Sequence, residues 1–225
     1  MQLPKPLHRW NVSTKQALAI QQRLAGRVST QPKNEPIRLV AGADLAFTPD
    51  GQRCVAGVVV WDLASQAVVE QQVATRPVQL PYIPGLLSFR EAPAVLAAIR
   101  KIKYEPQAFI FDGQGQAHPR RFGLACHVGL LIDHPSVGCA KSRLIGQYEQ
   151  PAPDRGATNP LTDGQERIGT VLRTRQGVKC VYVSIGHQMD LPSAERLVMS
   201  CCTRCRLPEP TRLADKLVGQ AKYQV

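Results

Sequence analysis

The order of strand-like and helical runs constrains the fold of this 225-residue chain more than any other feature. Three β-rich runs, at residues 38–47, 54–61 and 67–75, follow each other after short connections, which favours an antiparallel meander. A helical run then ends near residue 103, and strand 108–112, helix 124–132 and strand 137–140 come after it. Because helices alternate with strands in this part, parallel pairing is expected there.

These runs together predict a ribonuclease H-like α/β fold, in which a mixed sheet carries helices on both faces. Two further strands are expected at 168–173 and 181–185, then a helix capped by Ser193 and a last helix introduced by Pro208 and Pro210. Near the other end, Ser13 is suited to cap a helix within a segment of about residues 8–30. We expect residues 1–225 to form one domain that includes this helical segment.

Charge narrows the classes of partner. Lys and Arg number 28 against 17 Asp and Glu, a formal net charge of +11, and such a surface attracts phosphate backbones. No apolar run approaches the ~20 residues that a membrane helix needs. The first twenty residues contain no apolar segment of the secretory kind. We therefore expect a cytoplasmic, monomeric protein with no membrane partner, whose seven cysteines remain thiols.

Two aspartates lie where buried strands are expected. Asp44 falls inside the apolar run 39–47. Asp112 is the last residue of the strand expected at 108–112. An isolated buried carboxylate is costly, so each needs a cation, a metal or an exposed face. The Gly113-Gln114-Gly115 segment after Asp112 would let a ligand approach the backbone closely. The alternatives are a solvent-facing Asp44 and a structural Asp-Gly turn at Asp112.

Glu91 offers a third carboxylate, with a competing structural explanation. The segment from Ser88 to Glu91 fits the Ser-x-x-Glu pattern of a helix capping box. Beside Asp44 and Asp112, however, Glu91 would complete a cluster of hard oxygen ligands suited to Mg²⁺. Such a site can hydrolyse a phosphodiester with one ion or with two.

A proline-stiffened loop and two basic segments complete the candidate site. Pro81, Ile83 and Pro84 surround Tyr82, and a rigid loop that exposes an aromatic ring is suited to fill the gap left by an extruded base. The alternative is a turn with Tyr82 packed on the core. Residues 118–121 and 140–143 are basic, and each segment follows one of the expected strands. His118 could contact a phosphate or a base, and Lys141 could contact the scissile phosphate. The alternative is that both are ordinary surface groups.

Read together, the ordered segments 42–44, 81–91, 112–120, 140–143 and 209–214 closely resemble the endonuclease V family, over about residues 8–219. The resemblance implies Mg²⁺-dependent cleavage (with Mn²⁺ as a substitute) on the 3′ side of deoxyinosine in DNA, normally at the second bond beyond the lesion. Some relatives favour inosine-containing RNA. It also implies the roles of individual residues: Asp44, Glu91 and Asp112 as metal ligands, Lys141 as a catalytic lysine, Tyr82 as the wedge, His118 near the lesion, and Gly85, Leu87, Gly113 and Gly115 in segments that shape the lesion pocket.

Two features limit the resemblance, one at Asp215 and one at the cysteines of residues 201–205. Asp215 lies where relatives carry histidine or aspartate, and it is either a further catalytic acid or an exposed helical residue. Cys201, Cys202 and Cys205 lack the second ligand pair that a zinc site requires. His187 is more readily explained as structural. Two other classes remain open: a structure-specific nucleic-acid-binding protein that does not cleave, and a different ribonuclease H-like nuclease.

Overall fold

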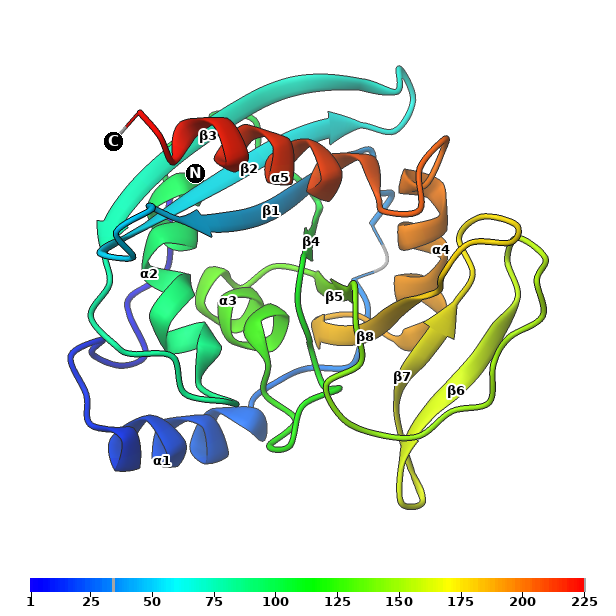
Figure 1. The fold of residues 1–225 in the computed structure, drawn as a ribbon, viewed down its shortest axis with the longest axis horizontal. Helices are drawn as coiled ribbons and strands as arrows, with labels where there is room; N and C mark the ends of the chain where they lie inside the picture. Colours follow the sequence, from blue (N-terminus) through cyan, green and yellow to red (C-terminus); the bar gives the residue numbers. More distant parts are fainter. Residues whose placement is uncertain (34, 225) are drawn as a thin grey trace.

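A computed structural model describes residues 1–33 and 35–224 (Figure 1). Within these residues, eight strands form one mixed sheet in the order β3-β2-β1-β4-β5-β8-β7-β6. The strands are β1 (Leu39–Phe47), β2 (Arg53–Asp62), β3 (Ala67–Pro77), β4 (Ala108–Phe111), β5 (Ser136–Ala140), β6 (Thr158–Asp163), β7 (Glu166–Leu172) and β8 (Val181–His187). The helices are α1 (Thr14–Ala25), α2 (Leu87–Ile99), α3 (Leu124–Ile132), α4 (Leu191–Cys201) and α5 (Glu209–Ala221).

The first three strands form the predicted antiparallel meander. β1 pairs with β2 and β2 with β3, both antiparallel. β2 is buried on both faces, because α2 packs on one side of it and α5 on the other. This double burial explains why β2 is almost continuously apolar rather than alternating between apolar and polar residues.

The centre of the sheet is parallel, as predicted. β1 pairs with β4 and β4 with β5, with α2 and α3 in the connections. Because parallel neighbours end at the same edge, the residues that follow β4 and β5 emerge together. Asp112 and Lys141 are those residues.

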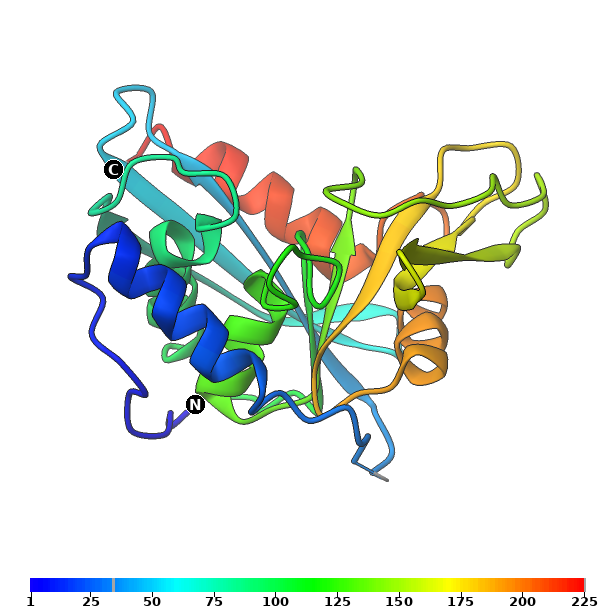
Figure 2. The same cartoon turned by 90° about the horizontal axis from the view of Figure 1, so that it is seen from below.

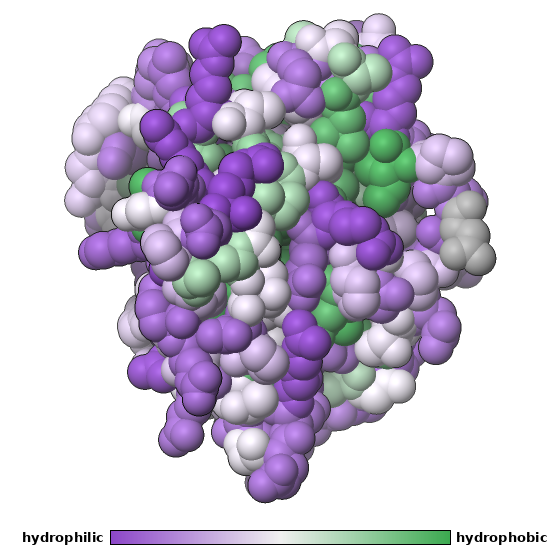
Figure 3. Space-filling view, turned by 90° about the vertical axis from the view of Figure 1, so that its right-hand side faces the viewer, coloured by the Kyte–Doolittle hydropathy of each residue, from purple (hydrophilic) through white to green (hydrophobic). Residues whose placement is uncertain are grey.

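Beyond β5 the sheet returns to antiparallel pairing through β8, β7 and β6. The edge strand β6 was not predicted, because it is short, largely exposed and contains Pro160. An edge strand tolerates proline since its N–H need not join the ladder. Figure 3 views this end of the molecule and shows mostly hydrophilic residues with smaller apolar areas.

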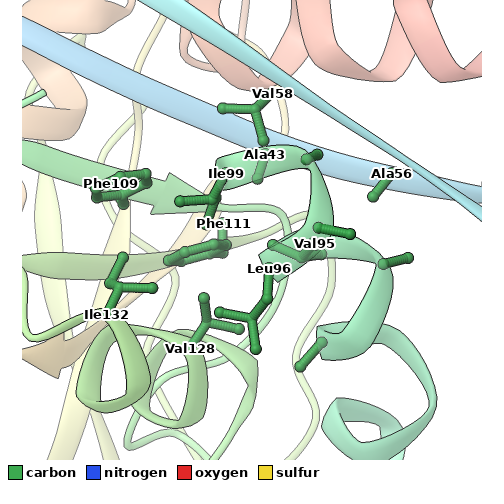
Figure 4. Close-up of a cluster of buried hydrophobic side chains, with 14 of the residues drawn as sticks. Ala43, Ala56, Val58, Val95, Leu96, Ile99, Phe109, Phe111, Val128 and Ile132 are labelled. Carbon is green, nitrogen blue, oxygen red and sulfur yellow. The ribbon is translucent and has the colours of Figure 1, made fainter. Parts of the chain in front are cut away.

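Helices cover both faces of the sheet, so the predicted fold class, a mixed α/β sheet flanked by helices, is confirmed. α2 and α3 lie on one face, with α1 outside them (Figure 2), and α4 and α5 lie on the other. Figure 4 shows α2 and α3 side chains packed against Phe109 and Phe111 of β4. Both phenylalanines are fully buried, and replacing either by alanine is expected to cost about 3–5 kcal/mol of stability.

Helix starts follow the sequence only in part. α1 has the predicted cap at Ser13, whose hydroxyl accepts the N–H of Gln16. α4 begins earlier than predicted, because Asp190 rather than Ser193 supplies the cap. α2 ends at Ile99 rather than near residue 103, and its start has no side-chain cap. The predicted helical segment at about residues 8–30 contains one helix, Thr14–Ala25, between stretches without regular secondary structure.

Among the described residues, no helix is both long enough and apolar enough to cross a membrane. All seven cysteines are free thiols, and six of them are buried. Cys201 and Cys202 pack with Cys139 in the apolar cluster beneath α4.

Candidate active site

Asp44 and Asp112 lie side by side on neighbouring parallel strands. Ala43 is in register with Phe111, and the Asp112 N–H donates to the Ala43 carbonyl at 3.3 Å. The Asp44 carboxylate is nearly buried: its Oδ1 accepts the N–H of Leu45 at 2.8 Å, while its buried Oδ2 has no hydrogen-bond partner. The alternative of a solvent-facing Asp44 was wrong, and a buried carboxylate oxygen without a hydrogen bond requires a nearby cation.

Two further charged groups join this pair. The Nζ of Lys141, which directly follows β5, lies 2.5 Å from Asp112 Oδ2, 3.7 Å from Asp44 Oδ2 and 3.6 Å from Asp215 Oδ1. Asp215 comes from α5, which crosses β1 so closely that a side chain at Gly42 would collide with the backbone of Pro210 and Thr211. Three strands and α5 thus converge on one ammonium.

Glu91 approaches the cluster from α2. Its side chain is buried, and Ser88 lies inside the helix rather than at its N-cap, so the capping-box explanation of Glu91 was wrong. Burial raises the pKa of Glu91 to about 8, and the charges of Asp44 and Asp112 add to this effect. The charges of both aspartates thus disfavour ionisation of Glu91.

Crowding and burial make the carboxylates weak acids. Burial raises the pKa of Asp44 to about 7, and the charge of Asp112 contributes to the rise. Burial also raises the pKa of Asp112, opposed only in part by Lys141. For Lys141, burial lowers the pKa, but the Asp112 hydrogen bond and the surrounding carboxylates outweigh it and raise the pKa overall.

The donor set fits a hard divalent cation. Carboxylate oxygens are the ligands that Mg²⁺ prefers, and Asp44 presents a buried oxygen, Oδ2, that accepts no hydrogen bond and lies 3.7 Å from the Lys141 ammonium. In the part of the chain that the structure describes, no three His, Cys, Asp or Glu side chains are grouped so that they could hold a metal ion together. The cation that contacts Asp44, Asp112 and Asp215 is instead the ammonium of Lys141.

A cavity of about 100 Å³ opens beside these carboxylates. The chain connects the cavity to the carboxylates at two places. Gly113, which lines the cavity, directly follows Asp112. Ser88, which also lines the cavity, lies one helical turn before Glu91. The lining residues are Tyr82, Pro84, Gly85, Leu87, Ser88, Gly113, Gln114, His118, Gly123, Leu124 and Leu144.

The predicted wedge and pocket residues divide into two groups. Tyr82, Pro84, Gly85, Leu87, Gly113 and His118 line the cavity, whereas Pro81, Ile83 and Gly115 do not. Ile83 packs with Leu86 and Phe89, and Gly115 donates its N–H to the Ser184 hydroxyl at 2.8 Å, in a place where a side chain would strike the Ile185 carbonyl. Gly115 therefore packs against β8 and does not contact the cavity.

The cavity mouth is apolar and exposed. Tyr82 is 65% exposed, Leu144 49% and Leu87 39%, so the alternative of a core-packed Tyr82 was wrong. Exposing large apolar side chains costs free energy unless a partner covers them. Three such residues around one cavity mark a surface suited to flat apolar rings, such as nucleobases.

The carbonyl of Gly85 anchors the proline-stiffened loop. It accepts hydrogen bonds from Arg120 Nη2 at 2.6 Å, Gln21 Nε2 at 2.9 Å and His118 Nε2 at 3.1 Å. His118 Nδ1 accepts the N–H of Arg120, so the proton of the neutral ring is on Nε2. Burial and the charge of Arg120 lower the pKa of His118 to about 4, so the ring is neutral at physiological pH and is suited to a base rather than a phosphate.

The basic segments are less free than the sequence suggested. Arg120 holds Gly85, and Arg121 pairs with Asp163 and Glu166 of the β6–β7 hairpin at 2.9 and 2.7 Å. Arg120 therefore fixes the loop at Gly85, and Arg121 fixes the β6–β7 hairpin.

Four supporting residues were missed by the sequence analysis: Gln21 at the Gly85 carbonyl, Ser184 at Gly115, Leu144 at the cavity mouth, and Arg206, which donates to the Lys141 carbonyl at 2.7 Å. Each acts across a long sequence separation. No local pattern signals such contacts.

The fold and the comparisons with known proteins define a class. The chain resembles a Streptomyces avermitilis endonuclease V structure (41% identity, TM-score 0.92, covering 96% of this chain and 95% of that one) and the catalytic domain of human endonuclease V (30% identity, TM-score 0.86, 93% and 96%). A Ciona intestinalis endonuclease V, solved with a 24mer DNA containing an inosine followed by a ribo-adenosine, shares the fold at 23% identity and a TM-score of 0.81, covering 93% of this chain and 98% of that one. The protein is thus a nuclease, a hydrolase.

Sequence comparison specifies the family. The endonuclease V profile matches residues 22–216. An endonuclease V of a Roseiflexus species is 50% identical over 213 residues, 95% of each chain, and that of Nostoc punctiforme is 48% identical over 213 residues, 94% of this chain and 96% of that protein. The chain belongs to the endonuclease V family, which confirms the predicted resemblance.

Proposed function

We propose that this protein is a ribonuclease H-like, Mg²⁺-dependent DNA repair endonuclease that hydrolyses the second phosphodiester bond 3′ to a deoxyinosine, leaving a 5′-phosphate. The observation that carries the proposal is the junction at Asp112 and Gly113, where a carboxylate of the cluster directly precedes a residue of the cavity. A base held in the cavity leaves its own strand next to the acids. Cleavage near the lesion follows from this adjacency.

Asp44, Glu91 and Asp112 would hold the metal, with Mn²⁺ as a substitute. Bound Mg²⁺ would supply an activated water and polarise the phosphate. Lys141 would neutralise charge on the scissile phosphate, and Asp215, 3.6 Å from its Nζ, would orient the ammonium. A cation held by these carboxylates would leave Lys141 available for this role, because the carboxylates would then no longer depend on the ammonium.

Recognition of hypoxanthine would use the uncapped start of α2. No side chain caps this helix, so the first-turn N–H groups near Leu87 and Ser88 are available to an acceptor at the cavity. Hypoxanthine presents a carbonyl acceptor and a ring N–H where adenine presents the opposite pattern. Each mismatched buried group costs about 1–3 kcal/mol, enough for useful discrimination when two act together.

Extrusion of the base would use the exposed loop. Tyr82, between Pro81, Ile83 and Pro84, would fill the gap in the duplex, while the Gly85 carbonyl keeps the loop fixed through Arg120, Gln21 and His118. Leu144, which follows β5 and also lines the cavity, would cover the base.

The substrate is proposed to be DNA bearing deoxyinosine or other deaminated bases, with inosine-containing RNA as a second substrate. The net charge of +11 favours either backbone. We further propose that the protein acts as a monomer in the cytoplasm.

Matched duplexes that differ only by inosine for adenine test the proposal. With Mg²⁺, end-labelled strands should be cut once, at the second bond 3′ to inosine, and EDTA should abolish cutting. Equal cutting of both duplexes would reject lesion recognition. Tight inosine binding without any cut would assign the protein to the non-cleaving class, and preference for a matched RNA would make it a ribonuclease.

A further inference from the structure

A chain of three hydrogen-bonding groups connects the N-terminal segment to the cavity. His8 Nε2 lies 2.7 Å from His127 Nε2, and His127 Nδ1 lies 2.9 Å from the hydroxyl of Ser88, which lines the cavity. His127 is fully buried and Ser88 is 3% exposed, so water does not compete for the contact between these two residues, whereas His8 is half-buried. None of these residues belongs to the carboxylate cluster.

The protons of this chain can be assigned in sequence. His8 Nδ1 lies 2.8 Å from the Arg9 carbonyl, which only accepts, so His8 carries a proton on Nδ1. A neutral His8 then has a lone pair on Nε2, which requires a proton on Nε2 of His127. Neutral His127 consequently has a lone pair on Nδ1, and the Ser88 hydroxyl must donate to it.

We propose that His8 and His127 form a tautomer relay that presents the Ser88 oxygen to the cavity as an acceptor, making Ser88 a specificity-determining residue for bases with a ring N–H. The proposal rests on the proposed function, because it assumes that the cavity receives the base. Hypoxanthine carries such an N–H and adenine does not.

Protonation of His8 reverses every bond in the relay. The His8 cation has protons on both nitrogens, so its Nε2 donates to His127. His127 then carries its proton on Nδ1 and donates to Ser88, whose hydroxyl hydrogen turns toward the cavity. In total one proton is added, and Ser88 changes from acceptor to donor, which favours a base with a ring acceptor.

The surroundings keep the relay neutral near pH 7. Burial lowers the pKa of His8 below 6.5. The hydrogen bond to the Arg9 carbonyl opposes this shift, and the charge of Arg23, whose guanidinium donates to the Leu7 carbonyl, adds to it. Burial lowers the pKa of His127 well below 6.5, with a contribution from His8. The aromatic rings that pack against the pair carry no charge: Trp10, Phe89 and Phe122. Reversal is therefore expected only below pH 6.5.

Nitrogen NMR of the free protein tests the relay independently of activity. At about pH 7.5 the ¹⁵N shifts should show the Nδ1–H form of His8 and the Nε2–H form of His127. As the pH falls, His127 should change to the Nδ1–H form together with protonation of His8. The opposite tautomers at neutral pH, or a His127 form that ignores the state of His8, would overturn the relay.

Binding in EDTA tests the consequence for specificity. The ratio of affinities for inosine and adenine oligonucleotides cancels effects on backbone binding. We expect His8→Phe, which keeps the ring packing, to lower this ratio about five-fold or more and to remove its pH dependence. Ser88→Ala should lower the ratio similarly. The control His134→Gln, which changes a histidine outside both the relay and the cavity, should not.

These two experiments separate the possible failures. Predicted tautomers without an inosine preference in the wild type would contradict the proposed function and leave the hydrogen-bond relay intact. An inosine preference that His8→Phe and Ser88→Ala both preserve would contradict the specificity role.

Discussion

The ammonium of Lys141 lies 2.5 Å from Asp112 and also contacts Asp44 and Asp215. It is the cation that makes this concentration of carboxylates tolerable in the folded protein. Its place among them links stability, metal binding and catalysis.

Lys141→Gln should lower cleavage of inosine duplexes on the order of 100-fold, because charge on the scissile phosphate loses its partner. The same variant should lower the melting temperature of the metal-free protein, and Mg²⁺ should restore most of that loss. Single-turnover cleavage and thermal unfolding check both effects. Lys103→Gln, an exposed lysine, is the control, and a Lys141 variant with full activity would contradict the assigned role.

The metal-free protein should become less stable as the pH rises. The folded pKa values of Asp44 and Glu91, about 7 and about 8, lie above their ordinary values of 3.8 and 4.5. The stability that these groups contribute is therefore complete below those ordinary values and is lost as the pH rises through 7 and 8. Thermal unfolding in EDTA at several pH values measures this decline.

Asp44→Asn should flatten that decline, whereas the exposed Asp154→Asn should not. Mg²⁺ should raise the melting temperature more at pH 9 than at pH 6, since ligands must lose their protons to bind metal. A metal-free protein that gains stability between these pH values would show that the acids are not crowded as described.

Gly85→Ala should impair inosine binding with little effect on metal binding. Gly85 has φ +78°, and a Cβ there would lie 2.6 Å from Arg120 Nη2, so both the backbone and the anchor of the loop are strained. The left-handed backbone alone costs about 1–2 kcal/mol. Gly51→Ala is the matched control, because Gly51 has φ +70° but open space around it. Equal inosine affinity in the two variants would refute the role of the anchor.

Tyr82→Ala and Leu144→Ala should each weaken engagement of duplex inosine about ten-fold, since a base loses one stacking or covering surface. Single-stranded inosine substrates should be less sensitive to Tyr82→Ala, because no duplex gap has to be filled. Tyr104→Ala, which removes another exposed tyrosine outside the cavity, is the control. Unchanged turnover on duplex substrate would exclude the wedge.

The sequence was sufficient for the elements whose patterns are local. The meander, the parallel centre and the carboxylates on neighbouring strands follow from strand periodicity and the order of elements. β6 was missed because Pro160 and its polar neighbours resemble a loop, and only pairing with β7 makes it a strand. The Ser-x-x-Glu pattern misled because the same four residues fit a helix start or a helix interior.

The site itself depends on contacts that no local pattern encodes. Gln21 reaches Gly85 from α1, and Arg206 reaches the Lys141 carbonyl from the segment before α5. The His8–His127 contact spans 119 residues. Tertiary packing alone brings such groups together, so they emerge only from the structure.

Anomalous diffraction from crystals grown with Mn²⁺ and an inosine oligonucleotide tests the central claim most directly. We expect a manganese peak bonded to Asp44 and Asp112, near Glu91, with the inosine base in the cavity lined by Gly85 and Gly113. In Asp112→Asn crystals the peak should weaken strongly. A peak elsewhere, or an inosine that remains stacked in its strand, would contradict the account.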